Sequence, residues 1–447
     1  MTQATPVETK SKPIPTVRAI PWVGNPRGFL SNPGKYLYDA YREYGEVFQI
    51  ELFGQRMIGL MGPEANRMIM TKQREYFSYA EGYEIVTAVL GDGLLFQDGD
   101  VARRNRKLMT PAFHNRGVRK YFDVMKECSE RHISNWASEG EGSMHDRFRH
   151  LTFEVMSRLI LGTGGKGDMK RLAHLNEVMA KGSSAFPRID SPLTTYGRGI
   201  RARIELETYL KDLITRRKAN NDEQEDCLGL LISAKDEDGD TLSVDELVQQ
   251  AIILMFAGHD TTSSYLSSFL PCITRETASL TRLIEEQIRV VGDDELTLDH
   301  LGEFEYLDAV LREIERLYPP ISLNLRGVLK PIEFQGYQLK PGDKVIYSPW
   351  ATHRMDSVFP KADEFDPDRF LEPRMEHRST PCALVGFGGG PRLCIGRAFG
   401  LMEAKIVIST LLREYSWSLK TTNPKLSFIP IVSPTCGLPG TVRRAAR

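Results

Sequence analysis

The alternation of apolar and polar positions predicts two short β regions. Residues 46–60 alternate on both sides of a Gly-Gln turn, which predicts a β-hairpin. Much later, residues 332–347 show short alternating runs separated by glycine and by a Pro-Gly-Asp turn. Both regions are short for so long a chain, so we expect the sheets to be small.

Most of the remaining sequence has the spacing of helices. Apolar residues recur at helical intervals in residues 121–136 and 200–214, among other segments. Ser243 and Glu246 match a capping box, and the residues that follow, to about Leu270, are apolar on nearly every side. A helix of this kind is expected to cross the core. The predicted fold class is therefore mainly α with small β sheets (α+β).

Length and composition favour one large globular domain. The 447 residues include 58 basic and 59 acidic side chains, and this balance argues against a general nucleic-acid or membrane-surface binder. No linker divides the chain, so we expect an N-terminal tail at 1–20 and a single domain at 21–447. The longest apolar run is too short for a membrane span, and residues 1–20 lack a signal-peptide pattern, which predicts a soluble, cytoplasmic protein.

The stretch FGGGPRLCIG at 387–396 is the most informative part of the sequence. Cys394 lies just before an apparent helix, whose N-terminal dipole and free N–H groups favour a thiolate. The glycines allow the backbone to approach a flat, bulky group, and Arg392 adds a cation. Zinc is excluded because no second ligand has the right spacing. A metal ligand, a hydrolase nucleophile and a buried structural cysteine all remain open from these residues alone.

A second motif interrupts the expected central helix at residues 257–262. Gly258 weakens the helix, and the Thr261 hydroxyl can bond the carbonyl of Ala257, which predicts a local groove for a small diatomic molecule. Asp260 beside Thr261 supplies an acid and a hydroxyl, the groups needed to deliver protons. The alternative is a polar turn with no chemical role.

A third motif pairs Glu313 with Arg316 on one face of a helix. By itself this spacing is typical of a solvated surface pair. Downstream, a proline-bounded loop offers Arg369 as a further partner.

Together, these motifs resemble the cytochrome P-450 family of haem-thiolate monooxygenases. The resemblance extends from about Val47 to about Ile431. The family patterns are met by Phe387, Gly390, Arg392, Cys394 and Gly396, by Ala257, Gly258, Asp260, Thr261 and Thr262, and by Glu313 and Arg316, with Arg369 as the third member of a structural triad.

The resemblance implies a P-450 fold with haem b (iron protoporphyrin IX) between the long central helix and the helix after the cysteine loop. Cys394 would be the axial iron ligand, whose thiolate favours O–O cleavage, and Asp260 with Thr261 would deliver protons. The residues expected to bind the cofactor are Cys394, Arg106, Arg326, Phe387, Arg392, Gly396, Ala257 and Gly258. Ala102 departs from the family, which usually has Trp or His there, so one haem-propionate donor is missing.

The implied reaction inserts one oxygen atom from O2 into an apolar substrate such as a fatty acid, terpenoid, retinoid or similar lipid. Electrons would come from an external ferredoxin or flavodoxin-type donor, received by a basic run at residues 103–120. The residues expected to line the substrate pocket are Tyr83, Ile85, Val86, Leu90, Phe96, Phe186, Ile253, Phe256, Ile321, Leu323 and Val432. The alternatives are a non-catalytic haem-thiolate gas or ligand sensor, a peroxide-driven oxygenase and a cysteine-nucleophile enzyme without haem.

Overall fold

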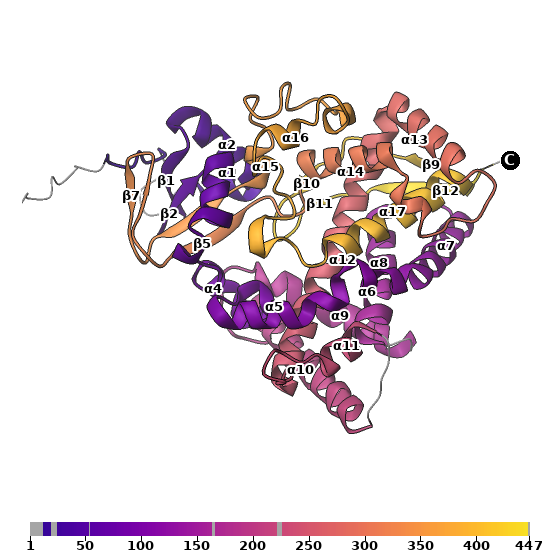
Figure 1. Ribbon diagram of the computed structural model, residues 1–447, viewed down its shortest axis with the longest axis horizontal. Coiled ribbons are helices and arrows are strands. Elements are labelled where there is room, and N and C mark those ends of the chain that lie inside the picture. The colour runs from indigo at the N-terminus through magenta and orange to yellow at the C-terminus, as the bar shows by residue number, and fades with distance from the viewer. Residues whose placement is uncertain (1–11, 19–24, 53, 163–165, 221–225, 446–447) are drawn as a thin grey trace, which may run out of the picture.

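The computed structural model describes residues 12–18, 25–52, 54–162, 166–220 and 226–445. Strands β1, β2, β5 and β7 lie at one end of the molecule and β9 and β12 lie near the other, and helices form most of the remainder (Figure 1). The expected mainly α architecture with small sheets is confirmed. No helix in the described ranges is long and apolar enough to cross a membrane.

The helices surround one long central member. In chain order they are α1 (Pro26–Ser31), α2 (Pro33–Tyr44), α3 (Pro63–Arg67), α4 (Tyr79–Leu90), α5 (Gly99–Phe113), α6 (Asn115–Val118), α7 (Phe122–Glu139), α8 (Met144–Leu161), α9 (Lys166–Ser183), α10 (Thr195–Ala219), α11 (Cys227–Ser233), α12 (Val244–Arg275), α13 (Thr277–Val290), α14 (Glu305–Leu317), α15 (Pro349–Thr352), α16 (Glu376–Ser379) and α17 (Arg397–Glu414).

The largest sheet joins distant parts of the chain. Its strand order is β1 (Val47–Leu52), β2 (Gln55–Leu60), β8 (Lys344–Tyr347), β5 (Asn324–Val328) and β3 (Phe77–Ser78). The predicted hairpin is confirmed as the antiparallel β1–β2 pair. Strands β2 and β8 run parallel and are joined by only two residue pairs.

Smaller sheets complete the β structure, and the predicted second β region is confirmed in β6, β7 and β8. The remaining strands are β4 (Gly142–Ser143), β6 (Ile332–Phe334), β7 (Tyr337–Leu339), β9 (Tyr415–Leu419), β10 (Leu426–Ser427), β11 (Ser433–Pro434) and β12 (Pro439–Arg444). Part of the expected tail also joins the β structure, because the N–H of Val17 donates to the carbonyl of Gln49 in β1 (2.8 Å). The tail's other residues at 1–11 and 19–20 lie outside the described part of the chain.

The central helix α12 begins with the predicted capping box. The Ser243 hydroxyl accepts the N–H of Glu246 (3.1 Å), and the Glu246 carboxylate accepts the N–H of Ser243 (2.8 Å). The helix continues past the expected end near Leu270 and includes Pro271. Its residues belong to the main hydrophobic core, where it packs against α8, α10 and α17. This arrangement places residues 257–262 in the interior, opposite the start of α17.

Candidate functional site

The cysteine loop has a backbone that requires glycine. Gly388 and Gly390 have φ angles of +76° and +58°, which L side chains rarely adopt. A Cβ on Gly390 would also lie 2.4 Å from the carbonyl oxygen of Met70. The loop closes where the N–H of Cys394 donates to the carbonyl of Phe387 (2.8 Å), directly before α17 begins.

Opposing effects act on the pKa of the Cys394 thiol. Cys394 is exposed to the space in front of it. Desolvation by the surrounding protein nevertheless raises the pKa of its thiol, and the N–H of Gly396 and the guanidinium groups of Arg106 and Arg397 act in the opposite direction. The helix terminus thus acts in the direction predicted from the sequence, but burial outweighs it. A coordinated metal ion deprotonates a thiol of this kind.

A mostly apolar cavity separates the cysteine loop from the central helix. Among the residues predicted to bind the cofactor or deliver protons, its walls include Ala257, Gly258, Thr261, Phe387, Cys394 and Gly396. The Thr261 hydroxyl donates to the carbonyl of Ala257 (2.7 Å), as its position predicted. Sequence reasoning missed several lining residues, including Phe113 of α5 and Met156 of α8, because side chains from other helices carry no local signal of their position.

Gly258 leaves room for one of these missed residues. A Cβ on Gly258 would lie 1.6 Å from Cε of Met156, which comes from α8. The glycine therefore allows close approach of two helices at the cavity wall.

Asp260 has partners that the sequence did not reveal. Its Oδ1 accepts from Nε of Arg149 (2.9 Å) and lies 3.1 Å from Nε2 of His259. Burial would raise the pKa of Asp260, but His259 and Arg149 outweigh it and hold the pKa well below its usual value. Asp260 is therefore ionised at neutral pH, and it does not line the cavity in front of Cys394.

Three arginines gather beside the cavity without acidic partners. Arg326 and Arg392 stack on the ring of Tyr79, at 3.4 and 4.2 Å from its centroid. Burial and the nearby Arg392 both lower the pKa of Arg106. Within the described ranges, no carboxylate lies within 4.0 Å of any of the three guanidinium groups, although Arg326 is almost fully buried. Buried cations normally have an anionic partner, so this cluster suits a group with carboxylates.

The third motif is buried rather than solvated. Arg316 forms a bidentate pair with Glu313 (2.6 and 2.8 Å), and both side chains are 0% exposed. Nε of Arg369 lies 3.4 Å from Glu313, and the N–H of Asp366 donates to the same carboxylate (2.7 Å). The surface-pair alternative is therefore wrong. The pair joins α14 to the loop that precedes the cysteine segment.

The residues predicted for the substrate pocket occupy different environments. Leu90, Phe96, Ile253, Phe256 and Val432 are buried, whereas Ile85 and Phe186 are exposed, Phe186 by 73%. Tyr83, Val86 and Leu323 are partly buried against hydrophobic clusters, and Ile321 is also partly exposed. The N–H of Val432 donates to the carbonyl of Pro320, which lines the cavity beside Cys394 (3.0 Å). Burial does not show which of these side chains contact a substrate, so the substrate pocket stays a prediction.

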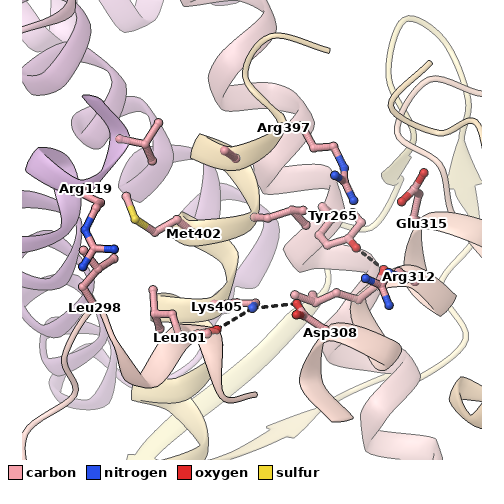
Figure 2. A pocket seen from close by; sticks show the side chains of 15 residues that line it. Arg119, Tyr265, Leu298, Leu301, Asp308, Arg312, Glu315, Arg397, Met402 and Lys405 are labelled. Atoms are coloured by element: carbon pink, nitrogen blue, oxygen red, sulfur yellow. Dashed lines mark hydrogen bonds and ion pairs between the residues drawn. The ribbon is translucent and has the colours of Figure 1, made fainter. Parts of the chain in front are cut away.

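A second cleft lies along the start of α17, the helix that follows the cysteine loop (Figure 2). Lys405 in this cleft is paired with Asp308 (2.7 Å). Arg312 and Arg397 also line it, and neither has a carboxylate within 4.0 Å among the residues that the structure describes. Glu315 is buried at its edge, and burial raises the pKa of its carboxyl to about 7, against Arg397 and the N–H groups of Phe387 and Gly386.

The basic run expected to receive an electron donor is largely neutralised. Arg103, Arg104, Lys107 and Arg119 form ion pairs with Asp100, Asp236 and Glu246, Glu237, and Asp299, respectively. The side chain of Arg116 lies outside the described part of the structure. By contrast, Arg312 and Arg397 of the cleft have no carboxylate within 4.0 Å among the described residues.

Comparisons with known proteins agree with this geometry. The family model described as Cytochrome P450 matches residues 11–437. A putative cytochrome P450 120 of Synechocystis sp. is 32% identical, with 93% of each chain covered, and cytochrome P450 26A1 of Gallus gallus is 28% identical over 95% of this chain and 89% of its own. A solved structure, described as retinoic acid bound cyanobacterial CYP120A1, superposes with a TM-score of 0.90 at 31% identity, covering 98% of this chain and all of the other.

A cysteine loop that faces Ala257, Gly258 and Thr261 of a long buried helix across an apolar cavity, inside this fold, defines the haem-thiolate class of oxidoreductases. The chain belongs to the cytochrome P450 family and is a haem-iron monooxygenase. The residues present fit that cofactor, because an exposed sulfur faces the cavity and three guanidinium groups without acidic partners among the described residues lie near the cysteine loop and Tyr79.

Proposed function

We propose that this protein inserts one oxygen atom from O2 into an apolar, lipid-like substrate, with Cys394 as the axial ligand of haem b. The observation that carries the proposal is the cavity in which Cys394 faces the Ala257–Thr261 turn. When bound, the haem iron supplies the activation of oxygen. The protein's own residues hold the iron, exclude water and supply protons.

The unpaired arginines are the proposed partners of the haem propionates. Arg326, Arg392 and Arg106 offer forked donors that match carboxylate geometry. Tyr79, which the sequence analysis missed, orients two of them by stacking. With Ala102 in place of a larger donor, these arginines carry the whole of the proposed interaction.

Proton supply is assigned to Thr261 and Asp260. The Thr261 hydroxyl lines the cavity, and the neighbouring Asp260 is ionised and so must receive each proton before it can pass one on. Thr261→Ala should keep the consumption of reductant while product formation falls by about tenfold or more, since a positioned proton donor contributes at least that much. Reductant and product measured together give this ratio, and an unchanged ratio would remove Thr261 from the mechanism.

The substrate is proposed to be a lipid of retinoid, terpenoid or fatty-acid type. The cavity beside Cys394 is lined mainly by apolar side chains. The retinoic acid bound relative, which shares the fold at a TM-score of 0.90, makes retinoids the first class to test. Among other relatives, a sterol 14alpha-demethylase of Mycolicibacterium vanbaalenii is 28% identical, so sterols belong in the same panel.

The electron donor is proposed to be a ferredoxin or flavodoxin-type protein that docks over the cleft along the start of α17. Arg312 and Arg397 line this cleft with no carboxylate within 4.0 Å in the described part of the chain, and they suit the carboxylates of an acidic donor (Figure 2). This surface replaces the basic run at residues 103–120, most of whose described cations are already paired.

Spectroscopy of the reduced, carbon monoxide-bound protein tests the proposal. We expect the Soret shift of a thiolate-ligated haem, and its loss in Cys394→Ser. A panel of retinoids, fatty acids, terpenoids and sterols is then screened for the low-spin to high-spin change, followed by mass analysis of products. A thiolate spectrum without oxygen consumption above background, given a competent donor and this panel, would support the sensor instead.

A further inference from the structure

A polar groove lies on the other side of the central helix from the cysteine. It has a volume of about 490 Å³ and is formed mainly by α8 and α9, with His259 of α12 among its lining residues. Ala257, Gly258 and Thr261 of the same helix line the cavity that contains Cys394. One turn of α12 therefore separates two spaces, and Asp260 lies within this turn.

The contacts of His259 require a hydrogen between its Nε2 and Oδ1 of Asp260. The side chain is 3% exposed, and its Nδ1 lies 3.0 Å from the carbonyl oxygen of Met255, which can only accept. Nδ1 must then carry a hydrogen. Its other nitrogen, Nε2, lies 3.1 Å from Oδ1 of Asp260, and a second hydrogen is needed there to avoid two acceptors in contact.

The neighbouring Asn176 is compatible with this assignment. Its amide lies 3.3 Å from Nδ1 of His259, and its own Oδ1 is buried without a partner among the described residues. The oxygen and nitrogen of an amide are assigned from their surroundings. The alternative orientation gives the buried oxygen the Nδ1–H as its donor and places the NH2 group in the position without a partner.

Other titratable and charged groups also face the groove. They are His132 of α7, Asp146, Arg149, His150 and Glu154 of α8, and Lys170, His174 and Glu177 of α9, with His145 of α8 close to the acid as well. Hydrogen bonds from His132 and Arg131 hold the pKa of Glu154 at about 2, and Lys181 lowers the pKa of Glu177. No group of three or more His, Cys, Asp or Glu side chains in the described ranges is arranged to hold a metal ion.

We propose that His259 supplies protons from this groove to Asp260, and so serves the oxygen chemistry from the side of the helix opposite Cys394. The imidazolium gives its Nε2 proton to the Asp260 carboxylate and becomes a neutral imidazole, which keeps its Nδ1–H on Met255. A proton from groove water then restores the imidazolium. Arg149 holds Oδ1 in place throughout. The inference rests on the proposed function, and His259 is a positioning residue because it acts through Asp260.

The test compares His259→Gln with a matched control. Glutamine keeps a hydrogen-bond donor for Asp260 but cannot titrate. His145→Gln is the control, because His145 also joins α8 to α12, through the Ser267 hydroxyl (2.9 Å), without contacting Asp260. Both variants are first checked for the thiolate-type carbon monoxide spectrum.

We expect His259→Gln to consume reductant while its rate of product formation falls by about a hundredfold, the lower end of what general acid catalysis contributes. The missing electrons should appear as hydrogen peroxide. The pH profile of product formation should be the same in the wild type and His145→Gln and should change in His259→Gln. Coupling and a pH profile equal to the control in His259→Gln would overturn the proposal.

A spectroscopic measurement is independent of turnover. In the reduced, carbon monoxide-bound protein labelled with ¹⁵N-histidine, we expect the signal that disappears in His259→Gln to come from a histidine with hydrogen on both ring nitrogens. An unprotonated Nε2 on that residue would overturn the proposal even if the variant does not fold. A wild-type protein that lacks the thiolate spectrum or product would instead contradict the proposed function.

Discussion

Replacing Arg316 with lysine tests how strongly the buried triad holds the cysteine segment in place. Arg316 donates five hydrogen bonds, two to Glu313 and three to backbone carbonyls. Lysine has three N–H donors, so at least two buried acceptors lose their partner. At about 1–3 kcal/mol for each unsatisfied acceptor, Arg316→Lys should cost about 2–6 kcal/mol of unfolding free energy.

Arg282→Lys is the matched control. Arg282 also binds a carboxylate through two nitrogens, Asp368 at 2.8 and 2.9 Å, but its side chain is 44% exposed. An exposed pair contributes about 0–1 kcal/mol, so this variant should unfold nearly as the wild type does. The unfolding free energies of both haem-loaded variants are measured by urea unfolding, which is followed by circular dichroism and by the Soret band. Equal midpoints for the two variants would refute the reasoning from burial.

Three further predictions concern the site. Since burial raises the pKa of Glu315 to about 7, the folded state holds this proton more tightly than the unfolded chain, and stability is lost as pH rises from about 4.5 to 7. Glu315→Gln should therefore match the wild type below about pH 4 and exceed it by about 3 kcal/mol at pH 8 in thermal or urea unfolding; equal pH profiles would contradict this. Arg326→Gln should speed haem transfer to an acceptor protein by about tenfold to a hundredfold, as expected for loss of a charged hydrogen bond, whereas an unchanged rate would remove Arg326 from haem binding. Gly258→Ala should force Met156 to move and weaken apolar ligand binding, read from the haem spin change, and Met156→Ala in the same protein should restore it.

The parts predicted well from the sequence are those with local signals. The capping box at Ser243, the hydrogen bond from Thr261 to Ala257, and the cysteine loop each depend on residues within a few positions of one another, although the helix runs unbroken through 257–262 where an interruption was predicted. Their backbone and hydrogen-bonding requirements are therefore visible in the sequence itself.

Features set by tertiary packing could not be predicted in the same way. The Glu313–Arg316 spacing is the same in a surface helix and in a buried one, and only the packed structure shows that both side chains are fully buried. Arg149 is far from Asp260 in the sequence, so the ion pair that keeps this acid ionised has no local signal. The motif at 257–262 did contain His259, but its neighbours in α8 and α9 were needed to show what it binds.

The contact between β2 and β8 has a consequence for biosynthesis. Ile58 pairs with Val345, so the hairpin's partner strand is synthesised roughly 290 residues later. At about 5–20 residues per second, the edge of the hairpin waits roughly 15 to 60 seconds on the ribosome before this strand emerges. The nascent chain thus presents an open strand edge for most of its translation, and chaperones that shield such edges should bind it before residue 345 leaves the exit tunnel.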